Sequence, residues 1–287
     1  MIKNDTPVLN EDVVFNRPYK TGFSLDIYPR EKVLSKKLTA IFFIHGGAWI
    51  TGRKESLNNR FRKDINQLIN KGDTIISPEY ILAKEGISPF SNYVIDVNDT
   101  IVWTKQLAEK YHLDLKNIGV WGASTGVHLA LMNRISHSYA FDSTFETPHF
   151  NCVVDVYGPT VLKGVCHSEM AHSIEHILEE LPDFLKDDYD IALQVFGFDP
   201  RQGTTRANSL VETFSPINYL KTGAPAILII RGSADHVVPP QQSWLLKQKL
   251  DSQSIEHELH LLKGVNHAYF GAREEQKKPL WTIKFYS

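Results

Sequence analysis

The chain has 287 residues, of which 42% are hydrophobic and 22% are charged. A chain of this length and composition buries a large core, which excludes a disordered or low-complexity protein. Its formal net charge of −2 excludes a general electrostatic attraction to nucleic acid or to an anionic membrane surface.

The N-terminal residues 1–12 contain no apolar stretch of the kind found in signal peptides. The densest apolar stretch, residues 41–50, is interrupted by His45-Gly46-Gly47 and is too short to span a bilayer. We therefore expect a cytoplasmic protein without membrane insertion, whose partner is a neutral or weakly charged small molecule. Cys152 and Cys166 are then expected to be free thiols, because a chain this large needs no disulfide.

The apolar pattern predicts two kinds of strand. Alternating apolar and polar residues predict an antiparallel strand at residues 23–28. Five later runs are short and almost continuously apolar, which is typical of parallel strands covered on both faces. These runs are residues 39–44, 74–77, 117–121, 151–157 and 226–230, and a last strand is expected at residues 256–262.

Helical periodicity separates these strands. Apolar side chains recur at helical spacing over residues 61–69, 94–108 and 127–135, and Gly72 stands where the first of these helices ends. The alternation predicts an α/β fold, with a mostly parallel central sheet and helices on both faces. We expect one domain, residues 1–287, in which residues 160–222 form a small cap-like insertion that shapes the ligand site.

The first buried strand is followed by the loop His45-Gly46-Gly47-Ala48-Trp49. Acyl transfer develops negative charge on one oxygen, and rigid backbone N–H groups aimed at that oxygen stabilise it. We expect an oxyanion hole made by Gly47 and Ala48, together with Thr125 further along the chain. His45 is a candidate base, but it precedes the donor loop, so we expect it to fix the loop by hydrogen bonds.

The segment Gly122-Ala123-Ser124-Thr125-Gly126 matches G-x-S-x-G, the turn that presents a serine nucleophile. The motif is weak by itself, and a plain glycine-bounded turn is the alternative. Here it directly follows a predicted strand and directly precedes a predicted helix, which is the context that the nucleophile needs. We therefore predict that Ser124 is the nucleophile.

A serine nucleophile needs a base, and the base needs a carboxylate. Asp235 follows the predicted strand at residues 226–230 and suits the carboxylate role, with capping of a helix near Pro240 as the alternative. His267 lies in the loop after the last predicted strand, whereas His257 and His260 lie within that strand. We predict that Asp235 and His267 complete the catalytic set.

The chain order of serine, aspartate and histidine is that of α/β-hydrolases. Over about residues 26–270 the chain resembles the α/β-hydrolase esterase/lipase family, in particular its BD-FAE-like and hormone-sensitive-lipase-like carboxylesterases. The matching stretches include residues 45–49, 79–85, 122–130, 157–159, 232–239 and 264–270. The resemblance implies the α/β-hydrolase fold and a carboxylesterase that works through an acyl-enzyme, without a metal or an organic cofactor.

Two departures from the family pattern bear on the acyl group. Ala48 replaces the third glycine of many relatives, and Thr125-Gly126-Val127 stands where Ala-Gly-Gly is frequent. With Trp49, which we expect to contact the substrate, these side chains crowd the nucleophile. Short-acyl esters of small molecules, acetylated sugars among them, are therefore the expected substrates. The alternative is that the insertion opens a long groove lined by apolar residues such as Met170 and Ile174.

Other readings remain. His172-Ser173-Ile174-Glu175-His176 fits a zinc-peptidase pattern, but no third ligand is evident, so we expect an amphipathic helix and no metal. Arylformamidase-type amide hydrolysis at the same site is the strongest rival activity, ahead of peptidase activity of the prolyl-peptidase kind. Binding without catalysis is a third possibility. The oligomeric state, a homodimer included, is left open by the sequence.

Overall fold

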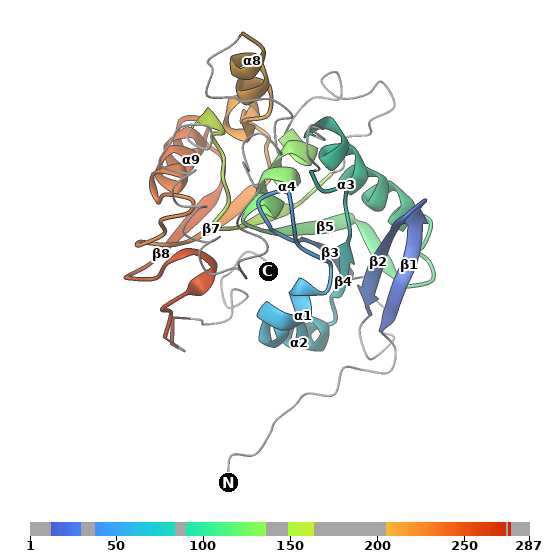
Figure 1. Ribbon diagram of the computed structural model, residues 1–287. Coiled ribbons are helices and arrows are strands. Elements are labelled where there is room, and N and C mark those ends of the chain that lie inside the picture. The colour runs from blue at the N-terminus through green and yellow to red at the C-terminus, as the bar shows by residue number, and fades with distance from the viewer. Residues whose placement is uncertain are drawn as a thin grey trace, which may run out of the picture.

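The computed structural model describes residues 13–29, 38–83, 90–135, 149–163, 205–273 and 275–276 (Figure 1). These residues form an eight-stranded sheet in the order β1-β2-β4-β3-β5-β6-β7-β8. The strands are β1 (Val14–Lys20), β2 (Phe23–Tyr28), β3 (Leu38–Ile44), β4 (Thr74–Pro78), β5 (Leu113–Ala123), β6 (Cys152–Val156), β7 (Ala226–Gly232) and β8 (His257–Leu262).

The sheet is parallel except at one edge. β1 pairs antiparallel with β2, and β2 pairs antiparallel with β4, whereas the pairs from β4 to β8 are all parallel. The parallel strands carry the continuous apolar runs, because helices cover both of their faces. The order and directions are those of the α/β-hydrolase fold, which confirms the predicted fold class.

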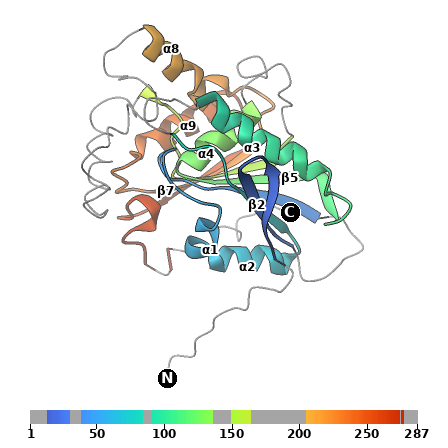
Figure 2. The ribbon, with the colours of Figure 1, turned by 45° about the vertical axis from the view of Figure 1, so that its right-hand side comes forward.

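Helices cover the two faces of the sheet unequally (Figures 1 and 2). Helices α1 (Ser56–Arg60) and α2 (Arg62–Lys71) lie on one face, and α2 ends at Gly72, whose φ of 100° closes the helix. The other face carries α3 (Phe90–Lys105), α4 (Thr125–Ile135) and α9 (Gln241–Ser252). Two separate clusters of buried apolar side chains result, one on each face.

The described part of the predicted insertion joins the main core. Helix α8 (Thr205–Thr213) and the 3-10 helix η4 (Pro216–Tyr219) form this part, and Val211, Phe214 and Leu220 are buried against the α3 and α4 face. Residues 164–204 lie outside the described residues. The cap-like insertion, Cys166 and the histidine pattern at residues 172–176 therefore stay predictions.

One strand was not predicted from the sequence. β1 is largely exposed and contains Pro18, so neither a clear alternation nor a continuous apolar run marks it. β5 is also longer than predicted, since Leu113 pairs with Leu38 well before the apolar run begins. β1 is extended by pairing with β2 at the edge of the sheet, whereas the start of β5 pairs with β3 inside the sheet, where Leu113 is buried.

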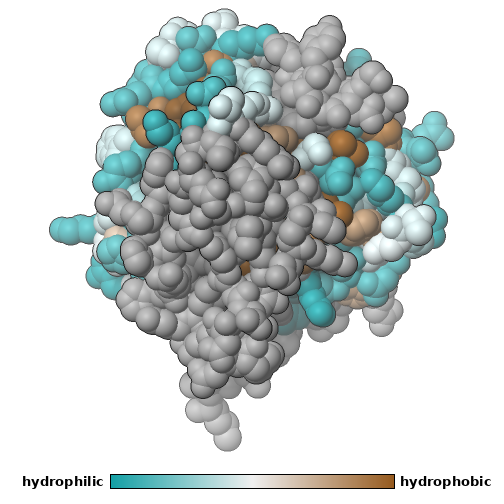
Figure 3. Space-filling view, turned by 45° about the horizontal axis from the view of Figure 1, so that its top comes forward, coloured by the Kyte–Doolittle hydropathy of each residue, from teal (hydrophilic) through white to brown (hydrophobic). Residues whose placement is uncertain are grey.

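The described residues that are visible on one face of the molecule are mainly hydrophilic (Figure 3). Figure 3 shows small, scattered apolar patches among polar residues on the face in view. No helix within the described ranges is long and apolar enough to cross a membrane.

Phe43 on β3 supplies a test of the packing beneath the sheet. Its ring packs edge-on against Phe61, at 5.5 Å between centroids, and Trp121, at 4.8 Å. We expect Phe43→Ala to lower the free energy of unfolding by about 3–5 kcal/mol, because it removes a buried ring and leaves a cavity. Phe15→Ala is the matched control, since Phe15 is 49% exposed. Urea denaturation measures the free energy of unfolding of both variants. An equal loss of stability in the two would contradict the placement of Phe43 in the buried core.

Candidate active site

Ser124 occupies a sharp turn between β5 and α4. Its φ of 52° is unusual for a residue with a side chain, and its N–H donates to the carbonyl of Val156 at 2.8 Å. The two flanking positions must be glycine because other backbone segments pass too close to leave room for a side chain. A Cβ on Gly122 would lie 2.4 Å from the nitrogen of Val127, and one on Gly126 would lie 2.0 Å from the carbonyl oxygen of Ile44. The G-x-S-x-G spacing thus has a steric cause, and Ser124 projects from the carboxyl end of β5.

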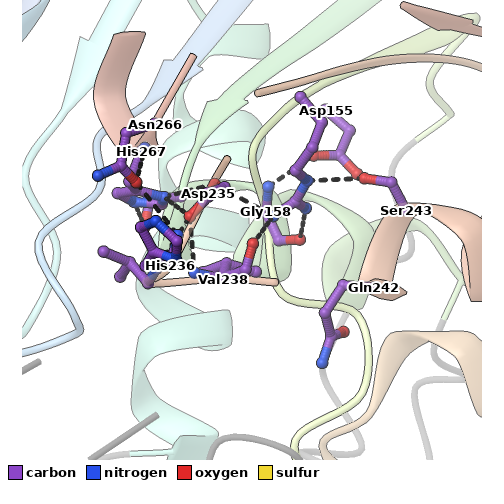
Figure 4. Close-up of polar contacts among 12 residues, drawn as sticks. Asp155, Gly158, Asp235, His236, Val238, Gln242, Ser243, Asn266 and His267 are labelled. Atoms are coloured by element: carbon purple, nitrogen blue, oxygen red, sulfur yellow. Dashed lines mark hydrogen bonds and ion pairs between the residues drawn. The ribbon is translucent and has the colours of Figure 1, made fainter. Parts of the chain in front are cut away.

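His267 and Asp235 form a hydrogen-bonded chain with Ser124. The Nε2 atom of His267 lies 3.1 Å from the Ser124 Oγ. The Nδ1 atom of His267 lies 2.9 and 3.1 Å from the Asp235 carboxylate oxygens, and Figure 4 shows His267 beside Asp235. A carboxylate oxygen accepts, so Nδ1 carries the proton and Nε2 is left to accept from the serine hydroxyl. The structure therefore brings the three predicted catalytic residues together, from loops after β5, β7 and β8.

Hydrogen bonds to the backbone hold the Asp235 turn. The Oδ1 atom of Asp235 accepts from the N–H groups of Val237 (3.0 Å) and Val238 (2.9 Å). Asn266 joins this turn to the histidine loop, because its Oδ1 accepts from the N–H groups of His236 and His267. The helix-capping alternative for Asp235 is wrong, since α9 begins at Gln241 with Pro240 as its N-cap.

The loop after β3 has an unusual backbone. Gly47, Ala48 and Trp49 have φ values of 130°, 52° and 63° in succession, and the Gly47 carbonyl accepts from Ile50 and Thr51. Within the described part of the chain, no acceptor takes a hydrogen bond from the N–H of Gly47 or Ala48. The N–H of Thr125, at the first residue of α4, has no acceptor within its own helix. Among the residues that the structure describes, none of the three N–H groups has an acceptor, and their role as an oxyanion hole stays a prediction.

His45 is held neutral beneath this loop. Its Nδ1–H donates to the Gly46 carbonyl at 2.8 Å, and its ring stacks on Tyr80 at 4.2 Å between centroids. The Tyr80 hydroxyl in turn donates to the His45 carbonyl at 2.8 Å. Burial lowers the pKa of His45 to about 4. These contacts support the expectation that His45 fixes the loop and is not the base.

Trp49 points into the core. Its side chain is 1% exposed and packs on Phe90, and its Nε1–H donates to Nδ1 of His128 at 3.4 Å. His128, which the sequence analysis did not single out, donates from Nε2 to the Phe214 carbonyl at 2.7 Å. The Trp49 side chain therefore anchors the loop in the core, and its predicted contact with substrate stays a prediction.

Metal ligation has no support among the residues that can be described. They contain no group of three or more His, Cys, Asp and Glu side chains able to hold a metal ion. The zinc-like pattern from His172 to His176 lies outside the described ranges. The expectation that neither a metal nor an organic cofactor is needed stays a prediction.

Known proteins resemble this chain over most of its length. The BD-FAE family model matches residues 25–250. Esterase LipC of Mycobacterium tuberculosis is 25% identical over 85% of the chain and 56% of its own length, and a kynurenine formamidase of Meyerozyma guilliermondii is 25% identical over 82% and 78%. A truncated carbohydrate esterase from gut microbiota superposes with a TM-score of 0.71 at 23% identity, covering 91% of this chain and 90% of that one. The chain spans about half the length of the first curated relatives it matches.

The buried His128 makes the stability of the fold depend on pH. Burial lowers its pKa from 6.5 to about 4, so the unfolded chain takes up a proton in that window while the folded chain does not. Stability therefore falls as the pH falls from 6.5 to 4. His128→Gln keeps a hydrogen-bond donor and an acceptor at this position. We expect the free energy of unfolding of this variant to fall by roughly 2 kcal/mol less than that of the wild type between pH 7 and 4.5.

Urea denaturation at both pH values measures this difference. His45, whose pKa burial also lowers, is present in both proteins, so its contribution cancels. Equal losses in the two proteins would show that His128 already binds its proton in the folded state.

Proposed function

We propose that this chain, which belongs to the BD-FAE family, is a serine carboxylesterase. The observation that carries the proposal is the continuous hydrogen-bonded chain from the Ser124 hydroxyl through His267 to Asp235. This is the arrangement in which a neutral imidazole can deprotonate a serine while a carboxylate supports the resulting charge.

In the first half of the proposed reaction, Ser124 becomes acylated. Nε2 of His267 takes the hydroxyl proton as Oγ bonds to the ester carbonyl carbon, and the carbonyl electron pair moves onto its oxygen. The N–H groups of Gly47, Ala48 and Thr125 stabilise this oxyanion. When the intermediate collapses, the bond to the alcohol oxygen breaks, and Nε2 donates its proton to the departing alkoxide. An acyl-Ser124 ester remains.

Water completes the reaction. Nε2 of His267 takes a proton from the attacking water, a second oxyanion forms, and collapse breaks the bond to Oγ. The proton returns to the Ser124 oxygen, and the carboxylic acid leaves. Throughout, Asp235 holds the imidazole through Nδ1 and supports its positive charge. No step of this proposal draws on a metal or an organic cofactor.

The substrates proposed are short-acyl esters of small molecules, with acetylated sugars as one class. Thr125 and Val127 follow Ser124 at the start of α4 and are 3% and 0% exposed, so bulky side chains are packed next to the proposed nucleophile in the chain. The match to a carbohydrate esterase supports sugar esters as candidates. The match to LipC covers 56% of that protein, so we do not infer the substrates of LipC for this chain.

Formamide hydrolysis is the second candidate. The match to a kynurenine formamidase extends over 78% of that protein, so the two chains correspond over most of their lengths. The same acylation and deacylation steps cleave a formamide, with an amine as the leaving group. Turnover of N-formylkynurenine more efficient than that of p-nitrophenyl acetate would favour the amide over the ester.

Removing the nucleophile tests the mechanism. We expect Ser124→Ala to lower kcat for p-nitrophenyl acetate by about 1,000-fold or more, with an unchanged melting curve. Ser252→Ala on α9, an exposed serine, is the matched control and should keep full activity. Adding His267→Ala to Ser124→Ala should cost little more, because the residues act as a unit. Retention of more than about a tenth of wild-type kcat in Ser124→Ala would rule out covalent catalysis at this serine.

The crowded elbow predicts a preference for small acyl groups. Across acetate, butyrate, octanoate and laurate esters of one alcohol, kcat/KM should be highest for acetate. Each added methylene must find apolar space or force a shift, which costs about 1–3 kcal/mol in a packed pocket. A maximum at octanoate or beyond would refute the crowded-pocket argument and support a long acyl groove.

A further inference from the structure

A buried arginine lies behind the Asp235 carboxylate. Arg231 on β7 is 0% exposed, and its Nη1 atom lies 3.5 Å from Asp235 Oδ2. Its other contacts are hydrogen bonds from Nε to the Ser243 hydroxyl (2.7 Å), from Nη1 to the Val238 carbonyl (2.6 Å) and from Nη2 to the Gly158 carbonyl (2.5 Å). Figure 4 shows how these partners surround one point between β6, β7 and α9.

Holding α9 against the neighbouring loops does not by itself require a charged side chain at position 231. Gln242, a neutral side chain, already ties α9 to the loop after β6, because its Oε1 accepts from the N–H groups of Thr160 and Val161 at 2.9 and 2.8 Å. A buried charge is costly unless it is paired, and burial lowers the pKa of Arg231. The feature that sets Arg231 apart from Gln242 is a cation next to the carboxylate that holds His267.

Asp155 supplies the opposing charge. It is fully buried on β6, and its Oδ1 accepts from the N–H of Gly158 at 2.8 Å. Burial raises the pKa of Asp155, and the charge of Arg231 opposes that rise. Gly158 joins the two residues, because its N–H donates to Asp155 and its carbonyl accepts from Nη2 of Arg231, while Nη1 of Arg231 lies 3.5 Å from Asp235. The positive charge behind the catalytic set is therefore partly neutralised by Asp155 and partly directed at Asp235.

We propose that Arg231 is a positioning residue that orients the Asp235 carboxylate and, balanced by Asp155, limits how strongly that carboxylate favours a protonated His267. A cation near an imidazole disfavours its charged form, and an anion favours it. Arg231 thus keeps His267 neutral and able to accept the Ser124 proton, while Asp155 prevents the cation from weakening the base too far. This inference rests on the proposed function for its meaning in catalysis.

Other titratable groups face His267 and are left unchanged in the test. The Tyr157 ring lies 4.6 Å from the His267 ring, and Tyr269 packs on Tyr157. Burial raises the pKa of Tyr269 well above its usual range, and Tyr157, Asp64 and Asp155 add to this rise. His236 is exposed on the Asp235 turn. Differences among variants of Arg231 and Asp155 therefore report on those two charges.

The test is an NMR titration of the His267 imidazole between pH 4.5 and 9 in the Ser124→Ala protein, which needs no activity. Loss of the resonance on adding His267→Ala assigns it. Arg231→Met should raise the pKa of His267 by about one unit, and Asp155→Asn should lower it, whereas Arg231→Lys should stay near the parent value. With Ser124 present, the acid limb of kcat/KM for p-nitrophenyl acetate should move in the same directions.

A purely structural role of Arg231 and Asp155 cannot shift the pKa of His267 in opposite directions in the two variants. Should Arg231→Met fail to fold, Arg231→Lys and Asp155→Asn still decide the question. No shift in Asp155→Asn, or an upward one, would overturn the inference. An active Ser124→Ala protein would overturn the proposed function instead, and the titration would still measure the effect of Arg231 on His267.

Discussion

The backbone turn at Ser124, with its φ of 52°, leaves β5 and enters α4 without an intervening loop. It can form because Gly122 and Gly126 bring the helix within contact of its own strand and of the end of β3. The same contact places the residue 46–49 loop beside Ser124. Since parallel strands end at one edge of the sheet, the loops after β7 and β8 arrive there too. The site is thus a consequence of close backbone packing at one edge.

Electrostatics at this edge follow from burial. His45 and His128 are kept neutral, with pKa values lowered to about 4 by burial, and they hold the residue 46–49 loop through hydrogen bonds. Ionisable side chains gather at Asp235, which lies 2.9 Å from Nδ1 of His267 and 3.5 Å from Nη1 of Arg231, and Gly158 links Arg231 to Asp155. The imidazoles of His45 and His128 hold the backbone in place, while the ring of His267 lies between the Ser124 hydroxyl and the Asp235 carboxylate.

The sequence predicted what depends on local pattern. Continuous apolar runs located the parallel strands, and the motif around Ser124, with the strand-end positions of Asp235 and His267, located the residues that meet. Hydrogen bonds between a side chain and a backbone carbonyl far away in the sequence were not predicted. His128 bonds to a carbonyl 86 residues away, and Arg231 to one 73 residues away. Trp49 was expected to contact the substrate because of its neighbours in sequence, which stays a prediction, whereas the packing of its ring on Phe90 was not foreseen.

The central claim is that Ser124 forms a covalent intermediate, and labelling by an organophosphate tests it most directly. Paraoxon transfers a diethylphosphoryl group to an activated serine and releases p-nitrophenol. Peptide mass spectrometry of the treated protein should find a single adduct, on the peptide that contains Ser124, and esterase activity should fall in step with its formation. An adduct on another residue that tracks the loss of activity, or full activity after complete modification of Ser124, would contradict the account.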